Sequence, residues 1–411
     1  MFKFTSEIKF NNSYLILLIA FAAFAAASTI VEINFSNFLR ERYNVGEWFR
    51  GFLEFPRESQ GFAIAFYVVL LGAFSERRLF SLAVLVAALG ALGLAFIPEV
   101  RIADGVAGIV PALPLILFVM LHSAGQHMAM MIERAIVVNH GDLSTAGSRL
   151  GKIGFWKTVA SLSVAGIVFG LRYIGDLEFR FFLLLAAGFY VSSLLLTRTA
   201  MRGQVNNQIK RRKLILKRKF LRYYVLSALF GVRKQVFITF SLWVIVVIYN
   251  QPVQTIALLW VITSVTNLAA QPLIGRLIDR FGPRKVLTAD AVLLCALCII
   301  YGYGAKLFVP SVGIFVVGAT YVFDHILFFV GSTRAVYVRS LTKDNEELSS
   351  TLSMGMTIDH VFSMTVPFLG GILWKLYGYE VVFLAAGIIA IITSAVAFGI
   401  KYKLPGKLAN A

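Results

Sequence analysis

The sequence has little charge for its length. Of its 411 residues only 15% are Asp, Glu, Lys or Arg, whereas 58% are hydrophobic. A soluble protein carries about 25% charged residues, so this composition excludes an ordinary soluble globular protein. Cysteine is scarce too, since Cys295 and Cys298 are the only two. They lie three residues apart in an apolar run with no second pair or nearby histidine, so we interpret them as buried small side chains.

Motifs of soluble enzymes are missing as well. The chain has no Gly-x-x-x-x-Gly-Lys-Ser/Thr sequence, so ATP is not expected to drive it directly. No Ser-His-Asp or zinc-hydrolase pattern is present, and we predict a protein that is not an enzyme and needs no cofactor or metal. The net charge of +18 does not indicate nucleic-acid binding, because the basic residues are spread over alternate loops rather than gathered in one domain.

Long apolar runs dominate the sequence instead. Runs of about twenty residues predict an all-α integral membrane protein with twelve transmembrane helices. They lie near residues 12–36, 59–75, 79–98, 106–132, 150–173, 180–197, 222–249, 254–274, 286–305, 310–336, 349–374 and 379–400. The longest loop predicted on the external side is residues 37–58. The first run continues through Ile33, so we interpret it as an uncleaved helix rather than a signal peptide.

Basic residues set the predicted orientation. Residues 198–222 carry ten Lys or Arg and no acidic residue, which predicts that this segment and both termini are cytoplasmic. An amphipathic helix lying on anionic lipid would explain the same charges. The predicted parts are an N-terminal six-helix bundle (1–197), a basic linker (198–221) and a C-terminal six-helix bundle (222–411). The expected location is the plasma membrane, which is the inner membrane in a bacterium.

One charged segment separates two apolar runs of the C-terminal half. Residues 275–285 read Gly-Arg-Leu-Ile-Asp-Arg-Phe-Gly-Pro-Arg-Lys, with five charges that must leave the hydrocarbon. Gly282 and Pro283 predict a tight turn. The segment resembles the signature loop of the major facilitator superfamily, Gly-x-Leu-x-Asp-Arg-x-Gly-x-Arg-Lys. A degenerate copy, residues 72–78, lies 203 positions earlier.

The resemblance implies a fold and a mode of action. It implies two six-helix bundles related by a parallel pseudo-repeat, and secondary active transport by alternating access to a site between them. Spans three, six, nine and twelve would stand outside as supports. The loop would gate the cytoplasmic side through Gly275, Asp279, Arg280, Gly282, Arg284 and Lys285. Residues 160–170 contain no proline, so the proline-glycine signature of proton-driven drug exporters is missing.

Ionisable residues inside the predicted spans indicate the working site. A charge in hydrocarbon costs at least about 2.5–3.5 kcal/mol, so these residues are expected to face a water-filled cavity. The predicted substrate-binding residues are Arg233, Lys234, Lys157, Arg334 and Glu32. The predicted proton-coupling residues are Asp324, His325, Asp359, His360 and His122. Neighbours on a helix point about 100° apart, so one member of each adjacent pair should face the cavity. Pairing that merely holds helices together is the alternative explanation.

The leading interpretation is a monomeric transporter in membrane lipid that moves a small anionic organic solute, coupled to protons. Neutralising Asp324 and Asp359 with protons would leave a positive cavity that attracts an anion. A drug or lipophilic-compound exporter and a lipid flippase of the same fold are alternatives, and a membrane transferase using the Asp-His pairs is another. Copper transport is a minor alternative, because imidazole and thioether groups cluster in span four. That cluster contains Met120, His122, His127, Met128, Met130 and Met131.

Overall fold

The chain forms long helices throughout the part that the structure, a computed structural model, describes. The described residues are 12–71, 74–139, 146–175, 177–202 and 216–402. The N-terminal helices are α1 (Asn12–Tyr43), α2 (Glu47–Leu71), α3 (Glu76–Phe96), α4 (Leu113–Asn139), α5 (Ala146–Ile174) and α6 (Phe179–Ala200). The C-terminal helices are α7 (Leu221–Val236), α8 (Leu242–Val247), α9 (Val253–Leu307), α10 (Pro310–Phe328), α11 (Thr333–Arg339), α12 (Asn345–Tyr377) and α13 (Tyr379–Phe398).

The described helices agree with twelve membrane crossings. Ten helical segments are long and apolar enough to span a membrane, and two of them join α7 to α8 and α10 to α11. Another is α9, whose 55 residues contain the non-helical residue Gly282 at φ 74°. That left-handed conformation suits glycine and turns the chain sharply, so α9 is two successive crossings. Together with α2, whose charges lower its hydropathy, the count is twelve.

Two predicted loops are wrong. Residues 37–58, expected as the one long loop, belong to α1 and α2 apart from the short turn at 44–46. The charges of this stretch made it look like loop, but they pair with one another inside the bundle, as described below. Residues 275–285, expected as a loop between spans, are helical except at Gly282. The tight turn predicted at Gly282 is present, and within this segment it alone interrupts the helix.

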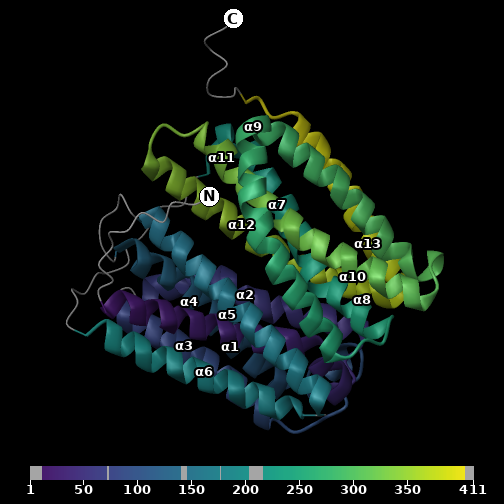
Figure 1. The fold of residues 1–411 in the computed structure, drawn as a ribbon. Helices are drawn as coiled ribbons and strands as arrows, with labels where there is room; N and C mark the ends of the chain where they lie inside the picture. The colour runs from purple at the N-terminus through teal and green to yellow at the C-terminus, as the bar shows by residue number, and fades with distance from the viewer. Residues whose placement is uncertain (1–11, 72–73, 140–145, 176, 203–215, 403–411) are drawn as a thin grey trace, which may run out of the picture.

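The helices form two groups, which we call the N-terminal bundle (α1–α6) and the C-terminal bundle (α7–α13). Figure 1 shows them as a purple-to-teal group and a green-to-yellow group. The bundles meet where α2 packs against α12, α5 against α9, and α1 against α8. Helices α3 and α6 pack against each other and against α1 and α4, which agrees with their predicted supporting role. Successive membrane crossings alternate in direction. We call the end that holds residues 202 and 216 the linker end and the opposite one the far end.

Small residues let helices of one bundle approach closely. A Cβ atom on Gly90 of α3 would collide with the His122 backbone of α4, and one on Gly125 of α4 would collide with the Ala87 backbone of α3. Close approach through small residues is a common way for membrane helices to associate, because burial from water contributes little there.

A π-helical turn, η4 (Phe237–Ser241), follows Val236, the last residue of α7. Such turns often occur at functional sites, and this one lies between the middle and the far end of its crossing.

Candidate functional site

A charged cluster from α1 and α2 runs through the N-terminal bundle from near the far end to mid-height. Glu54 accepts from Arg50 at 2.5 Å and from Arg57 at 3.1 Å, and Arg57 also donates to Glu32 at 2.5 Å. Residues three and four apart share one face of a helix, so Arg50, Glu54 and Arg57 line a single stripe of α2. Glu54 is fully buried, whereas the Glu32 side chain keeps 27% of its exposure. The cluster therefore neutralises two buried guanidinium groups with two carboxylates.

This N-terminal cluster touches the other bundle. The Gln235 amide of α7 donates to Glu54 Oε2 at 3.0 Å. The Arg50 guanidinium lies 5.8 Å from the centre of the Trp243 ring on α8. A buried hydrogen bond to a charged group contributes about 1.5–3 kcal/mol, so these contacts help to hold the bundles in the arrangement seen here.

Successive residues of α7 point to different neighbours. Arg233 points into the C-terminal bundle, where its Nη2 lies 3.0 Å from Asp324 and 3.9 Å from Asp290. Lys234 pairs with Asp359 of α12 at 3.0 Å. Gln235 crosses to the N-terminal bundle, as described above. The expectation that adjacent residues separate is confirmed, but both basic residues are paired with carboxylates.

A third cluster joins both bundles. Glu58 Oε2 of α2 lies 4.0 Å from His127 Nε2 of α4 and 3.8 Å from His360 Nδ1 of α12. The two imidazole rings are 5.5 Å apart between centroids. His127, a residue of the minor copper alternative, therefore lies beside a carboxylate and another histidine. His122, from the same alternative, has its Nε2 2.9 Å from the Tyr190 hydroxyl of α6.

The remaining predicted substrate and proton residues lie apart from one another. Lys157 of α5 pairs with Glu133 of α4 at 2.8 Å. The His325 Nδ1 lies 2.9 Å from the Tyr321 carbonyl oxygen of its own helix. The Arg334 guanidinium lies 3.7 Å from the centre of the Phe230 ring. The ten predicted residues thus form several pairs at mid-height rather than one continuous group.

Contacts between the bundles continue to the far end. Asn37 donates to the Gln251 carbonyl at 3.0 Å, and Gln254 donates to the Arg172 carbonyl at 2.8 Å. Near the tip, Lys375 Nζ lies 3.2 Å from the Asp104 carboxylate. At mid-height, Glu58 of α2 lies 3.8 Å from His360 of α12. The bundles are therefore joined from mid-height to the far end.

The linker end is basic, although four of the ten cations that residues 198–222 carry lie outside the described residues. Glu347 at the start of α12 accepts from Lys217 at 2.7 Å and from Lys219 at 2.8 Å. The hydrogen bond to Glu347 raises the pKa of Lys217 above its usual value, so that ammonium group is charged at any physiological pH. The predicted cations of residues 203–215 are among those that the structure does not describe.

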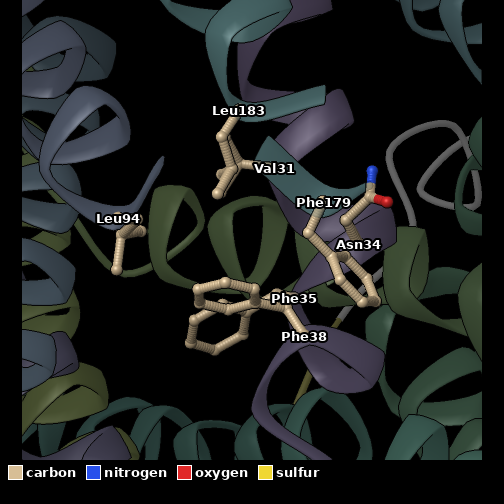
Figure 2. Close-up of a pocket in the computed structure, with 7 residues that line it drawn as sticks. All are labelled: Val31, Asn34, Phe35, Phe38, Leu94, Phe179 and Leu183. Carbon is tan, nitrogen blue, oxygen red and sulfur yellow. The ribbon is translucent and has the colours of Figure 1, made fainter. Parts of the chain in front are cut away.

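A narrow apolar pocket lies elsewhere, inside the N-terminal bundle. Figure 2 shows its lining from α1, α3 and α6, in which Asn34 is the one polar side chain among seven. It is too narrow for a water molecule. Its walls come from three helices of the N-terminal bundle alone. We therefore assign it no part in the candidate site.

Comparison with known proteins relates the chain to one superfamily. A sequence profile of the Major Facilitator Superfamily matches residues 223–410, the C-terminal bundle. The whole chain has the fold of solved transporters of this kind. A comparison with curated protein sequences finds no match.

Solved structures share this superfamily fold over almost the entire chain. The nucleoside transporter NupG is 13% identical, with a TM-score of 0.75 over 95% of this chain and 100% of its own. A bacterial homologue of the human lysosomal transporter Spinster, inward-facing and unoccupied, is 12% identical, with a TM-score of 0.69 over 96% and 97%. A D-xylose-proton symporter is 14% identical, with a TM-score of 0.69 over 96% and 98%. At such identities the likeness concerns the fold.

The superfamily loop lies at the linker end, around the turn between the two halves of α9. Arg284 lies 4.2 Å from the centre of the Phe398 ring of α13, and Arg280 lies 5.2 Å from the Phe281 ring. Asp279 and Lys285 are exposed, and neither makes an ion pair within the described part of the chain. A Cβ on Gly275 would meet nothing within 4 Å. The gating role of these residues stays a prediction.

Four charged residues of the site were missed by the sequence reading. Arg50, Glu54, Arg57 and Glu58 fell in the stretch that was expected to be an external loop. Their spacing was an available signal, because steps of four, three and one place them on one side of a helix. A loop gives no reason for such spacing. The opposite charges along that stripe indicated a buried ion-paired helix.

The Asp104–Lys375 pair gives a prediction of small effect. Because both side chains are partly exposed, at 24% and 42%, we expect Lys375→Met to change stability by less than about 1 kcal/mol. Thermal unfolding in detergent measures this change. The double variant Asp104→Lys with Lys375→Asp should restore the original unfolding temperature. A loss much larger than that of Arg42→Gln, which breaks an exposed pair with Glu99 inside one bundle, would contradict this assignment.

Proposed function

We propose that this protein is a proton-coupled secondary transporter of a small organic anion that works by alternating access. One observation carries the proposal. Two bundles meet at a mid-height layer of charged residues, and polar contacts between them continue from that layer to the far end. A solute that reaches this layer from the linker end would be released at the far end only after those contacts break. The superfamily fold, which it shares with solved transporters, supports this interpretation.

The Arg233 cluster is the proposed proton site. Arg233 is the one cation within 4 Å of the Asp324 and Asp290 carboxylates among the described residues, so the three side chains carry one negative charge in excess. All three are buried. His325 and Arg334 are the other charged groups that act on these carboxylates. Burial of an excess charge is costly, and binding one proton removes it. The proton would be shared by the two carboxylates rather than belong to either alone.

Arg334 is the proposed contact for the solute. Among the predicted basic residues that the structure describes, Arg233, Lys234 and Lys157 each have a carboxylate within 3.0 Å. Arg334 has none within ion-pair distance; it donates Nε to the Gly331 carbonyl at 3.2 Å and stacks on Phe230. A stacked guanidinium presents its remaining donors in a plane that matches a carboxylate or phosphate. This arrangement supports an anionic solute.

Transport by purified protein in liposomes tests the proposal. We expect uptake of a labelled carboxylate or phosphate ester to exceed that of uridine or D-xylose, and to rise when the outside is acidified. Asp290→Asn leaves a neutral Arg233–Asp324 pair, so it should abolish the response to the pH gradient while solute exchange persists. The exposed variant Glu99→Gln is the control and should behave as wild type.

Each part of the proposal can fail separately. Uptake that is the same with and without a pH gradient in wild type would refute proton coupling. A response to the gradient that survives in Asp290→Asn would refute the proton site. Wild-type uptake of uridine or D-xylose in preference to the anion, with the same preference in Arg334→Gln, would refute the anion contact.

A further inference from the structure

The third cluster brings together side chains from three helices and both bundles. Glu58 Oε2, His127 Nε2 and His360 Nδ1 are the facing atoms, and all three ligand atoms lie within 4.8 Å of one another. The three residues lie near the middle of α2, α4 and α12, far from either end of the bundles. Two imidazoles and one carboxylate are the ligand types that bind divalent zinc with a fourth position left open.

The geometry is close to that of an assembled site. Tetrahedral ligands at about 2.0–2.1 Å from zinc lie roughly 3.3 Å from one another. The two measured distances to Glu58 are 3.8 and 4.0 Å, so side-chain rotations that move each ligand atom by less than about 1 Å would complete the site.

The other nitrogen of His127 is already occupied. Its Nδ1 lies 3.0 Å from the Ser123 carbonyl oxygen and 3.1 Å from the Ser123 hydroxyl. A hydrogen bond to the carbonyl fixes the proton on Nδ1 and leaves the Nε2 lone pair toward Glu58, as in many zinc-binding histidines. His360 Nδ1 is buried and has no hydrogen-bond partner within the described structure. An unpaired buried nitrogen of this kind calls for a ligand.

Gly61 makes room for the cluster. A Cβ at this position of α2 would lie 2.5 Å from His360 Nδ1 and 3.0 Å from the His127 ring. The missing side chain therefore lets both imidazoles approach Glu58 from opposite bundles. The nearest cations do not oppose a bound metal strongly, because Arg57 is paired with Glu32 and Glu54, and Lys234 is paired with Asp359.

We propose that Glu58, His127 and His360 bind a divalent transition metal of the zinc type and that the ion clamps the two bundles together in the arrangement seen here. Two of the ligands belong to the N-terminal bundle and one to the C-terminal bundle. The site is complete only while α2 and α12 are packed together. A metal that binds one arrangement of the bundles and not the other shifts the protein toward the first.

Zinc binding to the full-length purified protein tests the site. Titration calorimetry with ZnCl2 alone should give one ion per chain in wild type. His127→Ala and His360→Ala should each weaken binding by at least about 100-fold, since even a loss outside the ligand shell costs about 10–100-fold. Glu58→His should retain binding because it supplies a third imidazole. The matched control is His325→Ala, which removes a histidine outside the cluster whose Nδ1 lies against the Tyr321 carbonyl oxygen of its own helix, and it should bind as wild type.

Three outcomes overturn the site: no zinc binding by wild type, equal binding by His127→Ala and His360→Ala, or equal loss in His325→Ala. The Glu58→His variant keeps the test valid if an alanine variant fails to fold.

The clamp is tested separately with spin labels at the exposed positions Val106 and Leu376 on the two bundles at the far end. Zinc should narrow their distance distribution in wild type and leave it unchanged in His360→Ala. A distribution that zinc does not alter in wild type would refute the clamp.

Discussion

Glu54→Gln is expected to lower the free energy of unfolding by about 3–5 kcal/mol, because it leaves two buried guanidinium groups with one carboxylate between them. Arg50 loses its only ion-pair partner among the described residues, and Arg57 keeps Glu32 alone. The Gln235 amide also loses its charged acceptor. Unfolding by graded detergent denaturation measures the change.

Two further variants test whether that loss of stability comes from the buried ion pairs. Glu99→Gln removes an acidic partner from an exposed arginine and should cost less than about 1 kcal/mol. The double variant Arg50→Gln with Glu54→Gln should recover part of the loss, because it removes one of the stranded cations together with the carboxylate. If Glu54→Gln were no more harmful than Glu99→Gln, the charged cluster would not be a buried ion-paired network.

Gly371→Leu is expected to lower the rate of transport at least about tenfold, while both bundles stay folded. Gly51 of α2 and Gly371 of α12 lie back to back at the far end. A Cβ on Gly371 would lie 2.8 Å from the Glu47 carbonyl oxygen and 3.0 Å from both the Gly51 Cα and the Trp48 carbonyl oxygen. Backbone atoms cannot rotate away from a larger side chain, so the helices must separate there.

Solute exchange in liposomes measures the effect, and thermal unfolding checks the fold. The control is Gly188→Leu on α6, where a Cβ would meet nothing within 4 Å, and it should exchange solute at the wild-type rate. Wild-type exchange by Gly371→Leu would show that transport does not require the bundles to close at the far end.

Helix positions were largely predictable because they follow from local hydropathy. Apolar runs and the Gly282 turn predicted the crossings, and the loop motif predicted the superfamily. The stretch 37–58 failed because hydropathy assumes that each charge meets lipid alone. Arg50 and Glu54 are tolerated in the bundle because they are paired, and pairing between helix faces is invisible to a count of apolar residues.

The grouping of the charges was not predictable, because it depends on packing between distant segments. Arg233, Lys234 and Gln235 are consecutive, yet they contact Asp324, Asp359 and Glu54 on three different helices. A helix turns about 100° per residue, so the sequence predicts that such neighbours separate. Which partner each one meets depends on how α7 is rotated against the helices around it, and a single sequence carries no record of that rotation.

Double electron–electron resonance tests the central claim, that the bundles exchange closure at one end for closure at the other. Spin labels at exposed Val106 and Leu376 report on the far end, and labels at exposed Ser148 and Arg276 report on the linker end. Gly371→Leu should lengthen the far-end distance and shorten the linker-end distance relative to wild type. A far-end distance that lengthens with no change at the linker end, or no change in either pair, would contradict alternating access by these two bundles.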